Sequence, residues 1–600
     1  MVRTAPLLYL LLAAISTGAQ TVDSVRWSNA EVPQLLLGTY DPAAYAATDP
    51  ISDHGQILCA LRTEVSADSL RAHLERLVSF GTRHTYSDTV STTTGMGAAR
   101  RWAMDRFNAY SAQHESRLRT AWLRFNYDDP DCGPHSDLRN VVAVLPGSQV
   151  EDPAIILIEG HLDSRCADNC DPLCAAEGAE DNGSGSALVL ELARVLSRYS
   201  FRHTLVFMLT TGEEQGLLGA EALADWCDVN GVAIKGVQNN DVIGGIWCGA
   251  TSSDPGCPVE GTADSTRVRL FSNGSVTKTY RGFARTIRLF YEEKLRPHVP
   301  VPMEIAVMGV EDRENRGGDH IPFREREYRN VRFTAAHEHG DANVEDSTYH
   351  DRQHTSADVL GVDTDGDLLV DSFFVDFNYL QRNAVINGMT ATLMALGPQP
   401  PAMVVHDEPT GLRVSFTPRP DLGAYRVGVR QGQANLTFNA LYRTTDTSFV
   451  VPGLNGGTLY YISAAGIDTN GIMSPFTREY GMTSDADTPP AATDPLDLGI
   501  ACTPIAVPER AWPTAAPLIL WPNPCLAGSV VLARPPGEHL YGPHTLRIRD
   551  GLGRTLTERP LPYMPGHGLE LIAPTGPGAY WITVERGGAP VGQGRLVVVP

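Results

Sequence analysis

Five short segments of the chain carry acidic or histidine side chains at positions that suit chemistry. They are residues 159–163 (EGHLD), residues 180–185 (EDNGSG), residues 212–216 (GEEQG), residues 240–241 (ND) and the pair His350 and His354. The first and third segments directly follow short apolar runs, residues 154–158 and 204–209, which are typical of buried strands. Functional groups gather at the carboxyl ends of strands in an α/β sheet, so we expect these segments to meet at one edge.

Imidazoles and carboxylates without a required thiolate form a donor set that zinc accepts. A pair of zinc ions needs one carboxylate that can give an oxygen to each ion, two further ligands per ion, and open positions for water. The residues that make up such a set are His161, Asp181, Glu214, Asp241 and His354. Glu213 lies beside a ligand without being one, which makes it the candidate general base. Asp163 is expected to hold the free N–H of the His161 imidazole and so to fix its tautomer.

Each segment also has an ordinary interpretation when it is taken alone. Asp181 or Ser184 could simply cap the helix that follows, and a Glu-Glu pair usually lies on a solvated face. The five segments together, in this order and near strand ends, favour a metal site. A further acidic stretch, residues 363–371, resembles half of a calcium loop but has Leu368 where an EF-hand loop has glycine. Two interpretations of this stretch therefore stay open, a Ca²⁺ site and an acidic surface loop.

The elements that must position these residues alternate between strands and helices. Strands are expected at residues 140–145, 154–158 and 204–209, and helices within 70–107 and at 187–199, 217–226 and 373–396. This alternation predicts an α/β fold with a mostly parallel mixed sheet and helices on both faces. Two small all-β sandwich domains are expected to follow it, because short alternating strands replace the helices after residue 401.

Changes in composition divide the chain into segments. Residues 1–19 are typical of a signal peptide, and residues 20–65 are expected to form an N-terminal extension packed on the next unit. Residues 66–397 are expected to form the catalytic domain. Two β-domains are expected at residues 402–482 and 517–600, joined by a linker at 483–516. Because linkers seldom carry core contacts, we expect residues 20–400 to fold without the rest. No later apolar run reaches the length of a membrane span.

The net charge argues against one class of partner, and the cysteine content indicates the redox state of the compartment. The net charge of −22 repels phosphates and argues against a nucleic-acid partner. Ten cysteines in an exported chain favour disulfides. We prefer disulfides to a zinc-thiolate site for the cluster Cys166, Cys170 and Cys174, because their spacing is not the usual C-x₂-C.

The combination of these segments resembles metallopeptidase family 28, the co-catalytic zinc family. The matching stretches are GHLDSR (160–165), EDNGSG (180–185), GEEQGLLG (212–219), NDVIG (240–244), GGDHIPF (317–323) and the region of His354, within residues 66–397. The resemblance implies the zinc exopeptidase fold, two Zn²⁺ ions, peptide or protein substrates, Asp181 as the bridging ligand and Glu213 as the base. His354 is preferred over His350 as the last ligand because His-Thr-Ser-x-Asp continues the family pattern. Asp319 and His320 are expected either to touch substrate or to play a structural role.

An aminopeptidase is the favoured function under this resemblance, and two alternatives stay open. A glutaminyl cyclase would share much of the site, use one zinc ion and cyclise N-terminal Gln. A non-catalytic surface binding protein would not need the six metal and base residues. The sequence does not decide between amino- and carboxypeptidase polarity.

The two C-terminal segments carry resemblances of their own. Residues 402–482 resemble a fibronectin type III domain, since Leu454 and Tyr460 have the spacing of a tyrosine corner. Residues 517–600 resemble the C-terminal sorting domain of type IX secretion, through the motif WPNP (521–524) and the terminal strand 594–599. That resemblance implies the secretion machinery as a partner, and a secreted or cell-surface location.

Overall fold

The computed structural model contains two compact units, residues 1–502 and 503–600. The structure describes residues 23–246, 263–272, 278–309, 317–336, 352–364, 370, 372–432 and 437–499 of the first unit. In the second unit it describes residues 516–521, 525–534, 540–549, 555–564, 569–576, 578–586 and 589–599. The predicted signal peptide, His350 and most of the predicted calcium loop lie outside these residues.

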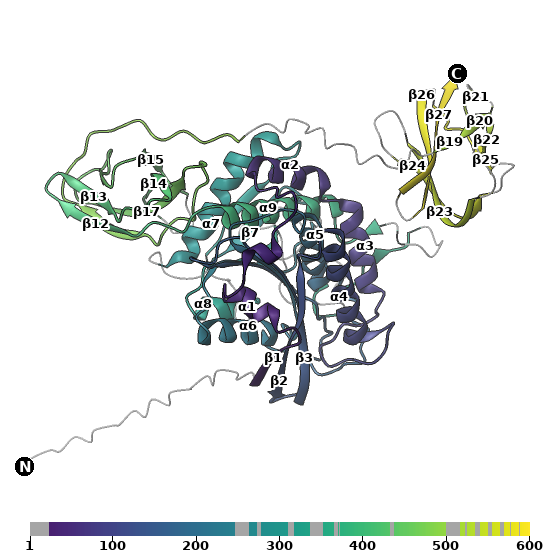
Figure 1. Ribbon diagram of the computed structural model, residues 1–600, viewed down its shortest axis with the longest axis horizontal. Coiled ribbons are helices and arrows are strands. Elements are labelled where there is room, and N and C mark those ends of the chain that lie inside the picture. Colours follow the sequence, from purple (N-terminus) through teal and green to yellow (C-terminus); the bar gives the residue numbers. More distant parts are fainter. Residues whose placement is uncertain are drawn as a thin grey trace, which may run out of the picture. The chain divides into compact units, whose positions relative to one another are not determined.

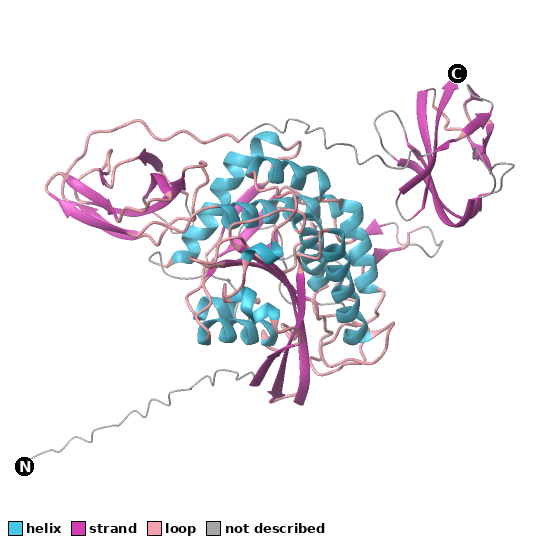
Figure 2. Cartoon of the chain, viewed as in Figure 1, coloured by secondary structure: helices cyan, strands magenta, loops and turns pink. Residues whose placement is uncertain are grey.

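A nine-stranded mixed sheet forms the centre of the first unit (Figures 1 and 2). Its strands are β1 (Asp23–Trp27), β2 (Arg119–Asp129), β3 (Gly133–Leu145), β4 (Ile155–His161), β5 (Thr204–Thr210), β6 (Ile234–Asn240), β7 (Arg267–Phe271), β8 (Glu304–Val307) and β9 (Asn330–Ala335). Their order is β1-β2-β3-β5-β4-β6-β9-β7-β8. The central strands β5, β4, β6 and β9 are mutually parallel, and antiparallel strands lie on both sides of them. The α/β fold class is confirmed.

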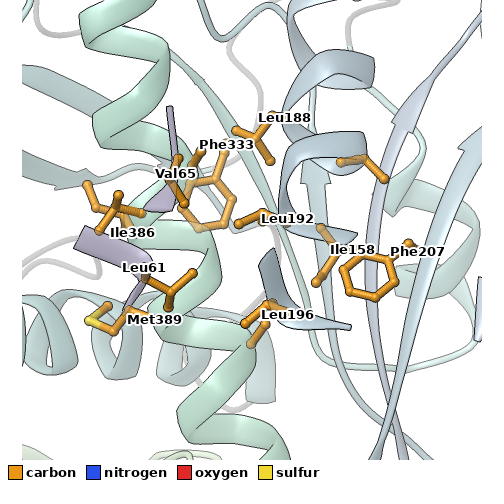
Figure 3. Close-up of a cluster of buried hydrophobic side chains, with 14 of the residues drawn as sticks. Leu61, Val65, Ile158, Leu188, Leu192, Leu196, Phe207, Phe333, Ile386 and Met389 are labelled. Atoms are coloured by element: carbon orange, nitrogen blue, oxygen red, sulfur yellow. The ribbon is translucent and has the colours of Figure 1, made fainter. Parts of the chain in front are cut away.

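Helices cover both faces of this sheet. They are α1 (Glu31–Leu36), α2 (His54–Glu64), α3 (Ala67–Val78), α4 (Gly95–Gln113), α5 (Gly185–Leu196), α6 (Leu218–Val229), α7 (Thr279–Phe290), α8 (His320–Glu325) and α9 (Phe377–Leu396), with short turns η1 (Pro42–Tyr45), η2 (Ala179–Ser184), η3 (Tyr291–Leu295) and η4 (Arg296–His298). Ile156 and Ile158 of β4 belong to the core under α5 and α9, whereas Ile155 and Leu157 belong to the core under α6. Leu188, Leu192 and Leu196 of α5 lie along one stripe near Ile158 and Phe207 (Figure 3). Buried side chains of this kind contribute about 1.5–3 kcal/mol each.

Two features of the catalytic fold differ from the pattern expected from sequence. The last helix begins at Phe377 rather than at residue 373, because the Asp376 side chain accepts a hydrogen bond from the Tyr379 amide and caps it. Residues 372–373 instead form β11 (Ser372–Phe373), paired with β10 (Gly361–Val362). The N-terminal extension contributes β1, which pairs with β2 at the edge of the main sheet.

Residues 403–484 form two small antiparallel sheets. The strands are β12 (Met403–Glu408), β13 (Gly411–Phe416), β14 (Leu422–Arg430), β15 (Ala440–Thr444), β16 (Ser448–Val450), β17 (Thr458–Asp468) and β18 (Tyr480–Ser484), in the orders β12-β13-β16 and β15-β14-β17-β18. The Tyr460 hydroxyl accepts a hydrogen bond from the Asn455 amide at 2.9 Å, which is the arrangement of a tyrosine corner. The assignment to the fibronectin type III family stays a prediction.

This β-module belongs to the same compact unit as the catalytic domain. Buried ion pairs join the two parts: Arg426 contacts Glu293 at 2.6 Å, and Arg285 contacts Glu479 at 2.9 Å. Phe476 is completely buried in the main hydrophobic core. The structure therefore differs from the expectation that the Pro-rich break at 397–401 separates two independent domains. Part of the predicted 483–516 linker also packs back, since the Gly499 amide donates to the Glu293 carbonyl.

The C-terminal unit is a separate β-structure with its own core. Its strands are β19 (Ala516–Pro517), β20 (Ile519–Trp521), β21 (Cys525–Leu526), β22 (Val530–Arg534), β23 (Leu540–Arg549), β24 (Thr555–Met564), β25 (Leu569–Ile572), β26 (Gly578–Arg586) and β27 (Ala589–Val599). Val531, Ile582 and Leu596 lie in its hydrophobic core. Most of the WPNP motif, residues 522–524, lies outside the described residues.

Two disulfides join the loop that follows β4 to itself and to the β2–β3 hairpin. Cys166 is bonded to Cys174, and Cys132 is bonded to Cys170. The preference for disulfides over a zinc-thiolate site is therefore confirmed for this cluster. Cys227 is a buried free thiol, contrary to a general expectation of pairing. Within the described part of the chain, no helix has the length and apolar character needed to cross a membrane.

Candidate metal centre

The predicted ligands converge at the carboxyl ends of the parallel strands. His161 is the last residue of β4, Asp241 directly follows β6, and Glu214 lies in the turn after β5. Asp181 lies in η2, immediately before α5. His354 comes from a distant loop and adopts a left-handed φ of 59°, an uncommon conformation for a non-glycine residue that clusters at functional sites.

Asp181 divides the donor atoms into two groups. Its Oδ1 lies 3.1 Å from His161 Nε2, and its Oδ2 lies 3.1 Å from His354 Nε2. His161 Nε2 also lies 3.4 Å from Asp241 Oδ1, and His354 Nε2 lies 3.2 Å from Glu214 Oε2. We call His161, Asp241 and Asp181 Oδ1 the first half-site, and His354, Glu214 and Asp181 Oδ2 the second half-site.

These spacings fit a pair of zinc ions. Four tetrahedral ligand atoms, each about 2.0–2.1 Å from zinc, are about 3.3 Å from one another. The separations of 3.1–3.4 Å in both half-sites match that value. Glu214 Oε1 is buried without a hydrogen-bond partner, which leaves it available to a cation. The carboxylate of Asp181 gives one oxygen to each half-site, as a bridging ligand must.

The charge of the site also favours metal binding. Six acidic side chains gather here with little contact with water: Asp163, Asp181, Glu213, Glu214, Asp241 and Asp319. Burial raises the pKa of Glu213 well above its usual range, and Asp241 and Glu214 raise it further although His161 opposes them. Burial also raises the pKa of Asp319 to about 7. So many buried carboxylates are costly unless cations neutralise them, as two divalent ions would do.

The first half-site is oriented by main-chain groups. His161 Nδ1 lies 3.1 Å from the main-chain carbonyl of Asp163 but 3.9 Å from its carboxylate. The Asp163 carboxylate instead accepts hydrogen bonds from the amides of Gly212 and Glu214, at 2.9 and 3.1 Å. The structure therefore differs from the sequence-based expectation in which group of Asp163 faces the His161 imidazole. Asp163 faces the imidazole through its carbonyl, and its carboxylate fixes the turn that carries Glu213.

Two further residues hold the loops in place. The Asp358 carboxylate accepts from the amides of Glu180 and Asp181, at 2.9 and 3.0 Å. The completely buried Arg83 donates to the carbonyls of Leu162 and Gly178 and so ties the loop after β4 to η2. Sequence reasoning noticed Asp358 only as part of a pattern. It missed Arg83, which lies in no motif and has no local signal.

A cavity of about 340 Å³ opens beside the donor atoms. Its lining includes Glu213, Glu214, Asp181, Asp241 and His354, together with Arg165, Gly216, Leu217, Gly317, Gly318, Ile321, Arg332 and Gln353. A carboxylate oxygen of Glu213 lies within 4.8 Å of donor atoms of His161 and Asp241. Glu213 thus has the position expected of a base, next to the metal ligands and facing the cavity.

Asp319 and His320 do not line this cavity in the described structure. Both are completely buried, and the Thr210 hydroxyl donates to Asp319. Their placement favours the structural role over contact with substrate.

Comparison with known proteins places this centre in a family. Residues 140–366 match the family model described as Peptidase family M28. A probable zinc metalloprotease of Pyrenophora tritici-repentis is 31% identical over 395 residues, which cover 64% of this chain and 85% of the relative. One from Pyricularia oryzae is 32% identical over 435 residues, which cover 70% of this chain and 83% of the relative.

The fold and the donor set define an α/β metal-binding enzyme. The similarity to these relatives extends over most of their length, and the chain belongs to peptidase family M28. Among solved structures, the LapA aminopeptidase of Legionella pneumophila is 18% identical with a TM-score of 0.40, covering 57% of this chain and 75% of that one.

Proposed function

We propose that the chain is a secreted zinc-dependent exopeptidase that removes residues from the amino terminus of peptides. The observation that carries this proposal is the position of Asp181, whose two carboxylate oxygens face two different histidine–carboxylate pairs. The aminopeptidase polarity follows the family resemblance of the sequence motifs. Two zinc ions are expected, held by the residues of the two half-sites.

Zinc bound here supplies Lewis-acid chemistry, which activates water and polarises the scissile carbonyl. The chain contributes the base. Glu213 faces the cavity beside the ligands, so its carboxylate can take the proton of the attacking water and return it to the leaving amine. The Asp163 carboxylate keeps Glu213 in place by holding the amides of Gly212 and Glu214.

The size of the cavity supports an exopeptidase. A volume of about 340 Å³ lies at the small end of the range of ligand cavities, about 300–1,000 Å³. Such a cavity suits a chain end rather than an extended segment. Ile321 and Leu217 supply its apolar lining, where a terminal side chain would rest.

The test combines zinc analysis with a panel of peptides. Peptides with free, blocked and N-terminal Gln ends are incubated with the zinc-loaded chain, and the products are identified by mass. Release of free amino acids from unblocked peptides, with two zinc ions per chain, supports the proposal. Cleavage of blocked peptides from the carboxyl end, cyclisation of Gln with one zinc ion, or binding without turnover would each overturn it.

Export and sorting are proposed on separate grounds. The two disulfides around Cys166 and Cys132 suit an oxidising compartment. The C-terminal unit is compact and separate, as a removable sorting domain would be. Intact-mass analysis of secreted protein should show loss of residues 1–19 and of the segment after about residue 515. A secreted chain of full mass would contradict this assignment.

A further inference from the structure

A second cavity, of about 640 Å³, lies between α2, α9 and the segment that precedes β8. None of the described residues that line it also lines the cavity beside the metal donors. Its volume is well within the range of ligand cavities, about 300–1,000 Å³. It is therefore a candidate site for a ligand other than the peptide at the metal centre.

One guanidinium in this cavity lacks an acidic partner. Arg382 of α9 is half-buried, and its Nη2 donates to the carbonyl of Ser265 at 2.6 Å. Its Nε is buried without a hydrogen-bond acceptor, and no carboxylate in the described part of the chain pairs with this side chain. An ionised carboxylate is the acceptor that best fits the fork of N–H groups on a guanidinium. Arg382 thus offers the cavity a positive charge that no side chain neutralises.

The other charges around the cavity also favour an anion. Arg62, near the end of α2, adds a second guanidinium and donates to the carbonyl of His298. Among the described lining residues the only carboxylate is that of Asp376, whose Oδ1 already accepts from the Tyr379 amide at the start of α9. Positive charge is therefore in excess here, in a chain whose net charge is −22. An anionic ligand is attracted to this cavity although most of the chain repels it.

Apolar side chains form most of the remaining lining. Val299, Pro300 and Val301 come from the segment before β8, and Val301 is 38% exposed. Val385 of α9 lines the same cavity. Exposed apolar groups gathered beside a guanidinium suit a ligand with an apolar body and one charged end. Such a ligand would remove these side chains from water while its charge meets Arg382.

We propose that this cavity binds small carboxylates that carry an apolar chain, with the carboxylate on Arg382 and the chain against Val299 and Val301. An aliphatic carboxylic acid and the carboxyl end of a short apolar peptide share this chemistry. The site is separate from the metal centre and goes beyond the proposed peptidase function. Its test therefore does not depend on peptide hydrolysis.

The test is a fluorescence titration of the zinc-loaded full chain with dansyl-labelled undecanoic acid, at concentrations below those at which the probe forms micelles. The parent should bind the probe saturably. Displacement by decanoate assigns the site to aliphatic acids, and displacement by N-acetyl-trileucine assigns it to peptide ends. Decanol and the C-terminal amide of the same peptide lack the charge, so they should compete at least tenfold more weakly.

Removal of zinc separates this site from the metal centre. Carboxylates also coordinate zinc, so part of the probe could bind there. The titration is therefore repeated after treatment with a chelator, and the affinity should stay within threefold of the zinc-loaded value. Loss of binding together with zinc would place the probe at the metal centre and overturn the inference.

Two variants test the two parts of the cavity. Arg382→Met keeps the apolar stem and removes the charge-assisted hydrogen bonds, which should weaken probe binding at least tenfold. Val301→Asp places a carboxylate in the apolar part and should weaken binding to a similar extent. Because Val301 is exposed, this variant carries the test if Arg382→Met does not fold. Arg71→Met removes an exposed guanidinium of α3 that lies outside the cavity, and it should change the affinity less than twofold.

Three further results would overturn the inference. They are a parent chain that shows no saturable binding, equal competition by the charged and uncharged analogues, and unchanged affinity in both Arg382→Met and Val301→Asp. A parent chain that binds the probe as expected but hydrolyses no peptide would instead refute the proposed function and leave this site in place.

Discussion

Glu213 and Glu214 are adjacent residues with the same functional group, and their surroundings give them different tasks. Both line the cavity, but Glu214 Oε2 lies 3.2 Å from His354 Nε2 in the second half-site, whereas a carboxylate oxygen of Glu213 lies near the donor atoms of His161 and Asp241. Glu213→Gln should therefore keep both zinc ions and lower kcat by about 10²–10⁴ through the loss of a general base. Zinc content and steady-state kinetics check this, with the exposed Glu75→Gln as the control. Near-normal kcat would show that Glu213 is not the base.

Asp181 is the one carboxylate that serves both half-sites. Asp181→Asn should lose zinc from both and with it nearly all activity, because an amide oxygen bridges two cations poorly. Asp168→Asn, in the neighbouring loop, is the control and should keep both ions, since Asp168 only caps the amide of Cys170. Metal analysis after gel filtration decides the matter. Full zinc content in the Asp181→Asn variant would show that Asp181 is not a metal ligand and only caps the helix.

The sequence identified the metal-site residues by type but not the atoms that they present. His161, Asp181, Glu213, Glu214 and Asp241 could be selected because each ends a strand, lies just after one, or lies just before a helix. Asp163 was selected as well, yet which of its oxygens faces the imidazole depends on backbone dihedrals that no spacing encodes. The contacts of Arg165 and Arg83 could not be predicted from the sequence for a related reason. Their partners lie tens of residues away along the chain.

Helix α3 packs against α5 through a polar contact as well as through leucines. His73 of α3 is 8% exposed, and its Nε2 lies 3.1 Å from the Tyr110 hydroxyl and 3.9 Å from Glu191 of α5. Burial lowers the pKa of His73 to about 4; Glu191 opposes this shift, while Arg194 and Arg106 add to it. His73 is therefore neutral in the folded chain at neutral pH.

This buried histidine makes stability depend on pH. The unfolded chain binds a proton at His73 near pH 6.5 and the folded chain only near pH 4, so the stabilisation is complete above 6.5 and is lost as pH falls between these values. The loss is on the order of 3 kcal/mol. His73→Gln should flatten the fall in unfolding free energy over pH 6.5–4, measured by urea denaturation. A parallel slope in both proteins would contradict this origin.

Regular elements could be predicted where one periodicity dominates. The strands β4 and β5 are buried on both faces and appear as continuous apolar runs, and α5 and α6 have clear apolar stripes. The start of α9 was misplaced because Phe373 and Phe374 extend its apolar pattern, whereas the capping carboxylate of Asp376 decides where the helix begins. A local hydrogen bond therefore outweighed the hydrophobic pattern.

At the scale of the whole molecule, composition indicated where the β-structure starts but not whether it is independent. The break at Gly397 is real, yet Lys235 Nζ donates to the Gly397 carbonyl at 2.6 Å and holds the segment against the sheet. Arg285, Glu293, Arg426 and Glu479 are charged residues, which a sequence places on surfaces by default. Only the tertiary structure shows that they are buried partners across a domain junction.

We therefore expect residues 20–400 to fold poorly without the β-module, in place of the independent folding expected from the linkers. Removal of the module leaves Arg285 and Glu293 without their buried partners and uncovers the core around Phe476. Loss of one partner of a buried ion pair costs about 3–5 kcal/mol. Thermal unfolding should show a large drop in Tm for 20–400 relative to 20–502, whereas 20–502 and the full chain should share the Tm of the catalytic unit.

A single substitution tests the contacts between the catalytic domain and the β-module without removing the β-module. Glu479 accepts from Arg430 within the module and pairs with Arg285 of α7, and all three side chains are almost fully buried. Glu479→Ala leaves two guanidiniums facing each other without a carboxylate, so the catalytic unit should lose about 3–5 kcal/mol of unfolding free energy. Glu408→Ala, which removes a half-exposed pair with Arg413 inside the module, should cost less than about 1 kcal/mol. If Glu479→Ala and Glu408→Ala unfold at the same denaturant concentration, and 20–400 matches 20–502 in Tm and kcat/KM, the junction is only a surface contact.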